Sequence, residues 1–149
     1  MTTSGAFSDG VNARADYGTA TANVQSVITS GDYSYGVRVR GYDGASATVG
    51  TVVTSGQFSI GVNVISDYGA ASATATSVTT SGVYSEGVSV YGYGDASATV
   101  GTVQTSGQYS RGVAVRSGYG AASATVTSVT TSGDHAVVVT VPTVAEASP

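Results

Sequence analysis

Few side chains in this sequence could perform acid–base or nucleophilic chemistry. His135 is the only histidine, there is no cysteine, and no Gly-x-Ser-x-Gly motif surrounds any of the many serines. A Ser-His-Asp triad would need His135, which occupies the place of an aromatic residue in a repeated pattern. We therefore interpret His135 as structural, and we predict that the chain is not an enzyme and binds no cofactor.

Aspartates recur at one turn of the same pattern, at Asp16, Asp43, Asp67 and Asp95. Stacked carboxylates could bind Ca²⁺ through their oxygen atoms. Their offsets within the turn differ, however, and the calcium-binding GGxGxD nonapeptide is absent. We interpret them as turn-forming residues and predict no metal site.

A regular array of small hydroxyl groups is a different kind of candidate. Ser and Thr alternate with Ala or Val, so they share one face of a strand, where a flat array could order water and bind ice. The same residue types also suit any exposed β face, Gly50 and Gly101 interrupt one row, and the first copy carries Asn23 and Gln25. The candidate ice-binding residues are Ser46, Thr48, Ser72, Thr74, Thr76, Ser97, Thr99, Ser123, Thr125 and Thr127.

A third candidate is the set of outward positions that vary around each Gly-Val-x-Val segment. All five arginines lie there, together with Tyr and Ile, a mixture that suits contact with a protein or a glycan. Sequence drift at solvent-exposed positions would also explain this variation. The candidate partner-binding residues are Arg14, Arg38, Arg40, Ile65, Tyr91, Arg111 and Arg116.

A tandem repeat positions all of these candidates. The triplet Thr-Ser-Gly begins at residues 3, 29, 54, 80, 105 and 131, so the spacing alternates between 26 and 25 residues. A fixed period of this length is typical of a solenoid, whose units bury their apolar faces only by stacking. One extra residue falls at the same turn of alternate copies, so two copies form a larger unit of 51 residues.

Each copy contains three segments of alternating residues, such as GVRVR (36–40), ASATVG (45–50) and TVVTSG (51–56), separated by turn residues. The chain also has no Leu and one Met, which argues against helices. We predict an all-β fold, a parallel β-helix (β-solenoid) of about five coils with three short strands per coil. The solenoid is expected over residues 1–141 and a loose tail over residues 142–149.

Stacking of the coils predicts two aromatic columns, because each residue lies over its counterpart in the next coil. One column contains Phe7, Tyr33, Phe58, Tyr84 and Tyr109, with His135 in the last position. The other contains Tyr17, Tyr42, Tyr68, Tyr93 and Tyr119. In the last copy Pro142 ends a strand, which indicates a cap or terminus.

The composition excludes several classes of partner. The net charge is −4 and there is no Lys, so we expect no binding to nucleic acid. No apolar run approaches the roughly 18 residues of a membrane-spanning helix, so we expect no membrane insertion. The first residues do not form a signal peptide, and Met1 is followed at once by TTSG, which we interpret as the start of a fragment or of a designed chain.

The repeated phrase resembles the passenger repeats of bacterial autotransporter proteins. The matching stretches are SVITSGDYSYGVRV (26–39), VVTSGQFSIGVNV (52–64), SVTTSGVYSEGVSV (77–90) and VQTSGQYSRGVAV (103–115). The resemblance covers residues 2–141 and implies a right-handed β-helix displayed outside a Gram-negative cell, as an adhesin or a stalk. Catalytic residues, self-export and membrane anchoring do not carry over, because the matching motif is structural.

We therefore expect a non-enzymatic, extracellular structural or adhesive segment at the bacterial cell surface, which binds a host or cell-surface protein or glycan. An ice-binding solenoid that uses the Ser/Thr array is the main alternative. A third possibility is a fibre unit that self-associates end to end, because the open ends of a β-helix can pair with further strands.

Overall fold

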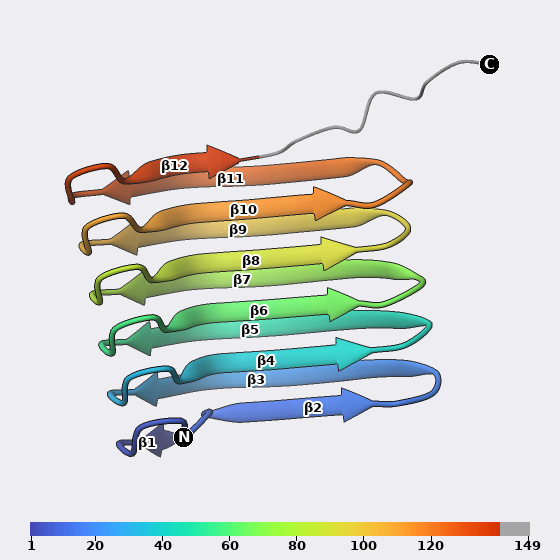
Figure 1. Ribbon diagram of the computed structural model, residues 1–149, viewed down its shortest axis with the longest axis horizontal. Helices are drawn as coiled ribbons and strands as arrows, with labels where there is room; N and C mark the ends of the chain where they lie inside the picture. The colour runs from blue at the N-terminus through green and yellow to red at the C-terminus, as the bar shows by residue number, and fades with distance from the viewer. Residues whose placement is uncertain (141–149) are drawn as a thin grey trace.

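The computed structural model describes residues 1–140, which form a parallel β-solenoid of about five turns with two sheets (Figure 1). Sheet A contains, in spatial order, β1 (Thr2–Thr3), β3 (Thr19–Thr29), β5 (Gly44–Thr54), β7 (Ala70–Thr80), β9 (Ala96–Thr105) and β11 (Ala122–Thr131). Sheet B contains β2 (Val11–Ala15), β4 (Tyr35–Gly41), β6 (Ile60–Ser66), β8 (Glu86–Gly92), β10 (Arg111–Ser117) and β12 (Val137–Thr140).

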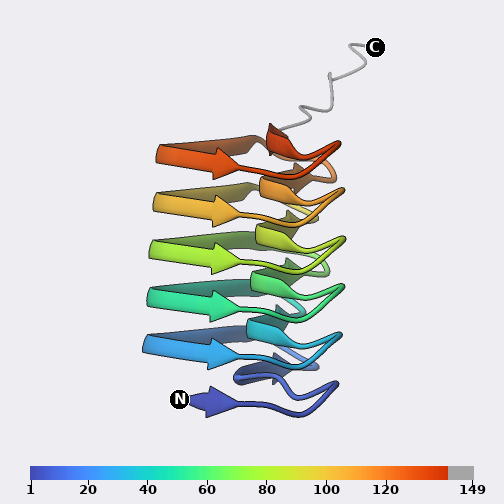
Figure 2. The same ribbon diagram turned by 90° about the vertical axis from the view of Figure 1, so that its left-hand side faces the viewer.

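The predicted all-β solenoid is confirmed, and the coils wind in a right-handed sense (Figures 1 and 2). The predicted tail at 142–149 and Pro142 lie outside the described residues. No helix long and apolar enough to cross a membrane occurs in residues 1–140.

The prediction of three strands per coil is wrong, because each coil has one short and one long strand. In β5 the inward–outward alternation slips once: Val49 and Val52 are buried, and two residues lie between them instead of one. Pairing with β7 continues on both sides of this slip, from Val49–Ala75 to Thr51–Ser77. The expected third turn is therefore a bulge-like irregularity inside a continuous strand.

Valine and alanine fill the narrow interior between the two sheets. Sheet A contributes a fully buried row that includes Val52 and Val78, and sheet B contributes paired rows such as Val37 and Val39. Burying a side chain of this size stabilises a fold by about 1.5–3 kcal/mol. The small alanines of sheet A, such as Ala47, belong to the same core and allow the two sheets to approach closely.

The chain passes from sheet A to sheet B through what we call the stacked corner, residues 30–34, 55–59, 81–85, 106–110 and 132–136. Its aromatic residue has a positive φ, between 54° and 59°, in every coil. Backbone bonds link the corners of successive coils, as from the N–H of Tyr33 to the carbonyl of Gln57 (2.9 Å). These bonds and the ring stacking offset the cost of a left-handed conformation, which is on the order of 1 kcal/mol.

A column of buried serines, which the sequence analysis did not single out, crosslinks the stacked corner. The hydroxyl of Ser59 accepts a hydrogen bond from the N–H of Ser34 (3.1 Å) and lies 3.2 Å from the carbonyl of Gly31. Ser85 and Ser110 repeat this arrangement in the next coils. The repeated Tyr-Ser and Phe-Ser pairs were the available signal, because a polar residue that recurs beside a turn often satisfies backbone groups.

The chain returns from sheet B to sheet A through the tyrosine corner, which carries Tyr17, Tyr42, Tyr68, Tyr93 and Tyr119. Here the predicted extra residue is confirmed. Three residues separate the paired positions Gly41 and Ala45, whereas four separate Ser66 and Ala71. Both sheets keep their register, because the turn alone absorbs the difference.

Candidate functional site: the two outer faces

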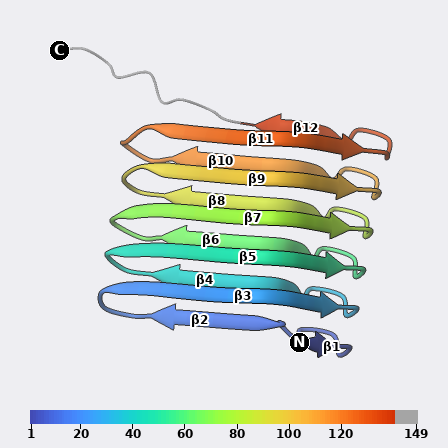
Figure 3. The same cartoon turned by 180° about the vertical axis from the view of Figure 1, so that it is seen from behind.

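Sheet A, whose strands lie toward the viewer in Figure 3, carries the predicted hydroxyl array on its outer face. Ser46, Ser72, Ser97 and Ser123 form one column in register, and Thr48, Thr74, Thr99 and Thr125 form the next. Thr76 and Thr127 are also exposed on this face. Strands β3, β5, β7, β9 and β11 contain no Asp, Glu, Lys or Arg, so the face is neutral.

A further hydroxyl column lies on this face, on residues that the repeat pattern had assigned to a separate third side. Thr51, Ser77, Thr102 and Ser128 pair in register along sheet A. Their strands continue through the slip after Val49, so this column extends the same array. The hydroxyl face is therefore wider than the sequence predicted.

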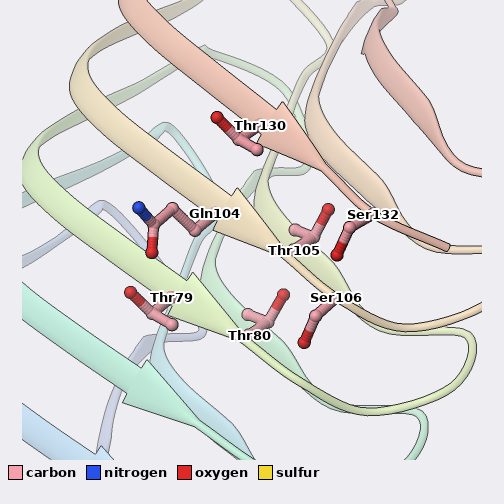
Figure 4. Close-up of a pocket in the computed structure, with 7 residues that line it drawn as sticks. All are labelled: Thr79, Thr80, Gln104, Thr105, Ser106, Thr130 and Ser132. Carbon is pink, nitrogen blue, oxygen red and sulfur yellow. The ribbon is translucent and has the colours of Figure 1, made fainter.

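A groove of about 270 Å³ lies where β7, β9 and β11 meet the stacked corner (Figure 4). Its walls carry hydroxyl and amide groups and no charge. The lining residues are Thr79, Thr80, Gln104, Thr105, Ser106, Thr130 and Ser132. In the coils below, apolar Ile28 and Val53 occupy the column of Thr79, so the groove belongs to the C-terminal half of the solenoid.

The outer face of sheet B carries the predicted partner-binding residues, but most of its arginines contact other side chains of the chain. Arg40 binds Asp67 of the next coil through two bonds of 3.1 Å, and Arg111 binds Glu86 at 3.0 Å. Arg14 pairs with Asp16 at 2.7 Å, within a single coil. Exposed pairs like these contribute about 0–1 kcal/mol each, so their main effect is to neutralise the face and order its side chains.

Arg38 lies 4.9 Å from the ring centre of Tyr35, in cation–π geometry. Arg116 is exposed and forms no ion pair with any residue of the described chain. It pairs in register with Tyr91, which pairs with Ile65. Of the seven predicted residues, the structure thus leaves Ile65, Tyr91 and Arg116 as one continuous column without an internal charge partner, half-buried at Ile65 and exposed at Tyr91 and Arg116.

The remaining candidates serve structural contacts. The imidazole of His135 stacks on Tyr109 with a centre-to-centre distance of 5.0 Å and an angle of 9°, as its aromatic position predicted. Asp95 accepts a hydrogen bond from the N–H of Ala121 in the next coil (2.9 Å), and Asp67 binds Arg40. Within residues 1–140, His and acidic side chains do not gather into any group of three that could hold a metal ion.

Comparisons with protein families, with curated proteins and with solved structures find no match to this chain. The resemblance to autotransporter repeats therefore rests on the quoted repeat phrase alone.

Proposed function

We propose that this chain is a non-enzymatic structural and adhesive segment displayed outside a bacterial cell, as its repeat phrase suggests. The observation that carries the proposal is the column Ile65–Tyr91–Arg116, held in register on sheet B with Tyr91 and Arg116 exposed. Tyr and Arg are the side chains that most often dominate the binding energy of interfaces. The rest of the solenoid supplies a scaffold on which this column is presented at a fixed spacing.

The repeated contacts between coils support the structural part of the proposal. Both sheets and the aromatic columns join each coil to the next, and the serine column does so as far as Ser110. The Arg40–Asp67 and Arg111–Glu86 pairs also join adjacent coils. These contacts make each coil depend on its neighbours for stability, as in other solenoids.

The adhesive part is tested on immobilised cell-surface glycans and extracellular-matrix proteins. The double substitution Tyr91→Ala with Arg116→Ala should weaken retention at least ten-fold. The matched control, Thr74→Ala with Thr125→Ala on sheet A, should bind like the parent. Binding that survives the sheet B substitutions and is lost in the sheet A control would contradict the proposal, because the adhesive surface would then lie on sheet A.

A second candidate function, ice binding, is favoured by the uncharged hydroxyl face of sheet A. Within a column, residues of adjacent coils lie about 4.8 Å apart. Along a strand, successive outward residues lie about 6.6 Å apart, because every second residue points outward. We expect purified protein to produce faceted ice crystals and a freezing gap, and Thr74→Tyr with Thr125→Tyr to remove both. Round crystals without a gap would eliminate this candidate.

A further inference from the structure

The tyrosine column is not evenly spaced. Ring centres are 6.3 Å apart for Tyr17–Tyr42 and 5.6 Å apart for Tyr68–Tyr93. They are only 4.5 Å apart for Tyr42–Tyr68 and 4.7 Å apart for Tyr93–Tyr119. The column therefore consists of close pairs, one in each two-coil unit.

The alternating length of the tyrosine corner explains this pairing. In each close pair the backbone N–H of the second tyrosine donates to the carbonyl of the first: Tyr68 to Tyr42 and Tyr119 to Tyr93, both at 2.9 Å. Between the pairs the bonding is offset, because the N–H of Tyr93 donates to the carbonyl of Ser66 (3.2 Å). Direct bonding brings the two side chains of a pair together, and the offset separates one pair from the next.

The paired rings are also tilted and open to solvent. Their planes meet at 42° in Tyr42–Tyr68 and at 50° in Tyr93–Tyr119. The exposed fractions run from 38% for Tyr42 and Tyr93 to 75% for Tyr119. In a biphenol formed from two tyrosines the rings are joined edge to edge and twisted, which a close, tilted pair approaches and a parallel stack does not.

We propose that Tyr42–Tyr68 and Tyr93–Tyr119 are oxidative modification sites, at which a haem peroxidase and hydrogen peroxide join each pair as dityrosine. Each phenol gives up one electron and its hydroxyl proton, and the peroxide takes up both electrons and both protons to form two water molecules. The two phenoxyl radicals form a carbon–carbon bond between their ortho positions. The two ortho hydrogens then move to the oxygens, so that two phenols are restored and the protein has lost two hydrogen atoms.

The consequence is a covalent bond between adjacent coils, placed once in each two-coil unit. The stacked corner offers an internal comparison, because Tyr84 and Tyr109 lie parallel at 10° and 5.0 Å. Their backbone φ values of 55° and 56° and their stacked neighbours hold the ring faces, not the edges, against each other.

Trypsin digestion shows which segments are crosslinked, because trypsin cleaves only after arginine in this chain. Tyr93 lies in fragment 41–111, and Tyr119 is the single tyrosine of fragment 117–149. A bond between them links these two fragments. Coupling of the wide pair Tyr17–Tyr42 would instead link fragments 15–38 and 41–111.

The experiment treats dilute full-length chain with a plant haem peroxidase and hydrogen peroxide, and then measures intact mass and tryptic fragments. We expect monomer that has lost two hydrogen atoms per crosslink, with the 41–111/117–149 product at least ten-fold more abundant than the 15–38/41–111 product. Tyr93→Phe should abolish the first product, and Tyr91→Phe should leave it unchanged. Equal amounts of the two products, or a 41–111/117–149 link that persists in Tyr93→Phe, would overturn the proposal.

Discussion

The two corners of each coil differ in the constancy of their length and in the geometry of their aromatic rings. The stacked corner has one length in every coil, and its parallel rings lie 5.0–5.2 Å apart. The tyrosine corner alternates in length, and its tilted rings lie 4.5–6.3 Å apart. Backbone bonds join successive coils at both corners. Buried serine hydroxyls add further bonds at the first corner, whereas the second absorbs an inserted residue without disturbing the sheets.

The largest expected difference is between two particular glycines, Gly82 and Gly94, because Gly69 of the tyrosine corner is also tightly enclosed, by the carbonyl of Asp43. A Cβ at Gly82 of the stacked corner would overlap the carbonyl of Gly56, whereas a Cβ at Gly94 of the tyrosine corner has no heavy atom closer than 3.3 Å. Gly82→Ala should lower the free energy of unfolding by about 3 kcal/mol or more, and Gly94→Ala by less than about 1 kcal/mol. Urea unfolding measures both. Equal losses would show that these two positions are equally constrained.

A smaller loss is expected from the buried serine column. Ser59→Ala removes the acceptor for the N–H of Ser34, which is buried in the same corner. The free energy of unfolding should fall by about 1–3 kcal/mol, the cost of an unsatisfied buried group. Ser123→Ala on the exposed face of sheet A is the control and should change it by no more than about 0.5 kcal/mol. A Ser59 variant as stable as this control would contradict the role of the column.

Ring stacking is expected to contribute still less to the free energy of unfolding, and to contribute unequally at the two corners. Tyr84 and Tyr68 are similarly exposed, at 51% and 58%, so their replacement by Leu compares the ring contacts themselves. Tyr84→Leu should cost about 1–2 kcal/mol, because it removes two parallel stacks at a residue with positive φ. Tyr68→Leu should cost about half as much. Thermal unfolding in which Tyr68→Leu is the more damaging change would reverse the comparison.

The smallest expected effect is a dependence on alkaline pH that originates in the tyrosine corner. The neighbouring phenol of Tyr68 raises the pKa of Tyr42 above its ordinary value of 10.0, and Tyr119 does the same to the pKa of Tyr93. The folded chain therefore keeps these protons at pH values where the unfolded chain releases them, so stability falls as the pH rises above about 10.

Tyr42→Phe with Tyr93→Phe should reduce this alkaline loss of stability. Urea unfolding at pH 9 and at pH 11 measures it. The same loss in the parent and the double variant would show that other groups cause the pH dependence.

The sequence by itself determined the all-β class, the coil length, the register and the membership of both aromatic columns. The reason is that repeated side chains can stack like on like in a single alignment only, so the spacing of Thr-Ser-Gly sets which residues become neighbours. It also located the hydroxyl array, because alternation along a strand assigns residues to a face.

Only the tertiary structure decided how far the hydrogen bonding of each strand continues. It also decided which partner each long side chain reaches. The slip after Val49 has the alternation expected of a corner, and only the pairing of β5 with β7 on both sides of it shows that it is not one. Arg40 binds Asp67 of the next coil, a contact that no local sequence pattern predicts. The close tyrosine pairs likewise require two successive corners of different length, because a single repeat copy does not show how its ring lies against the next.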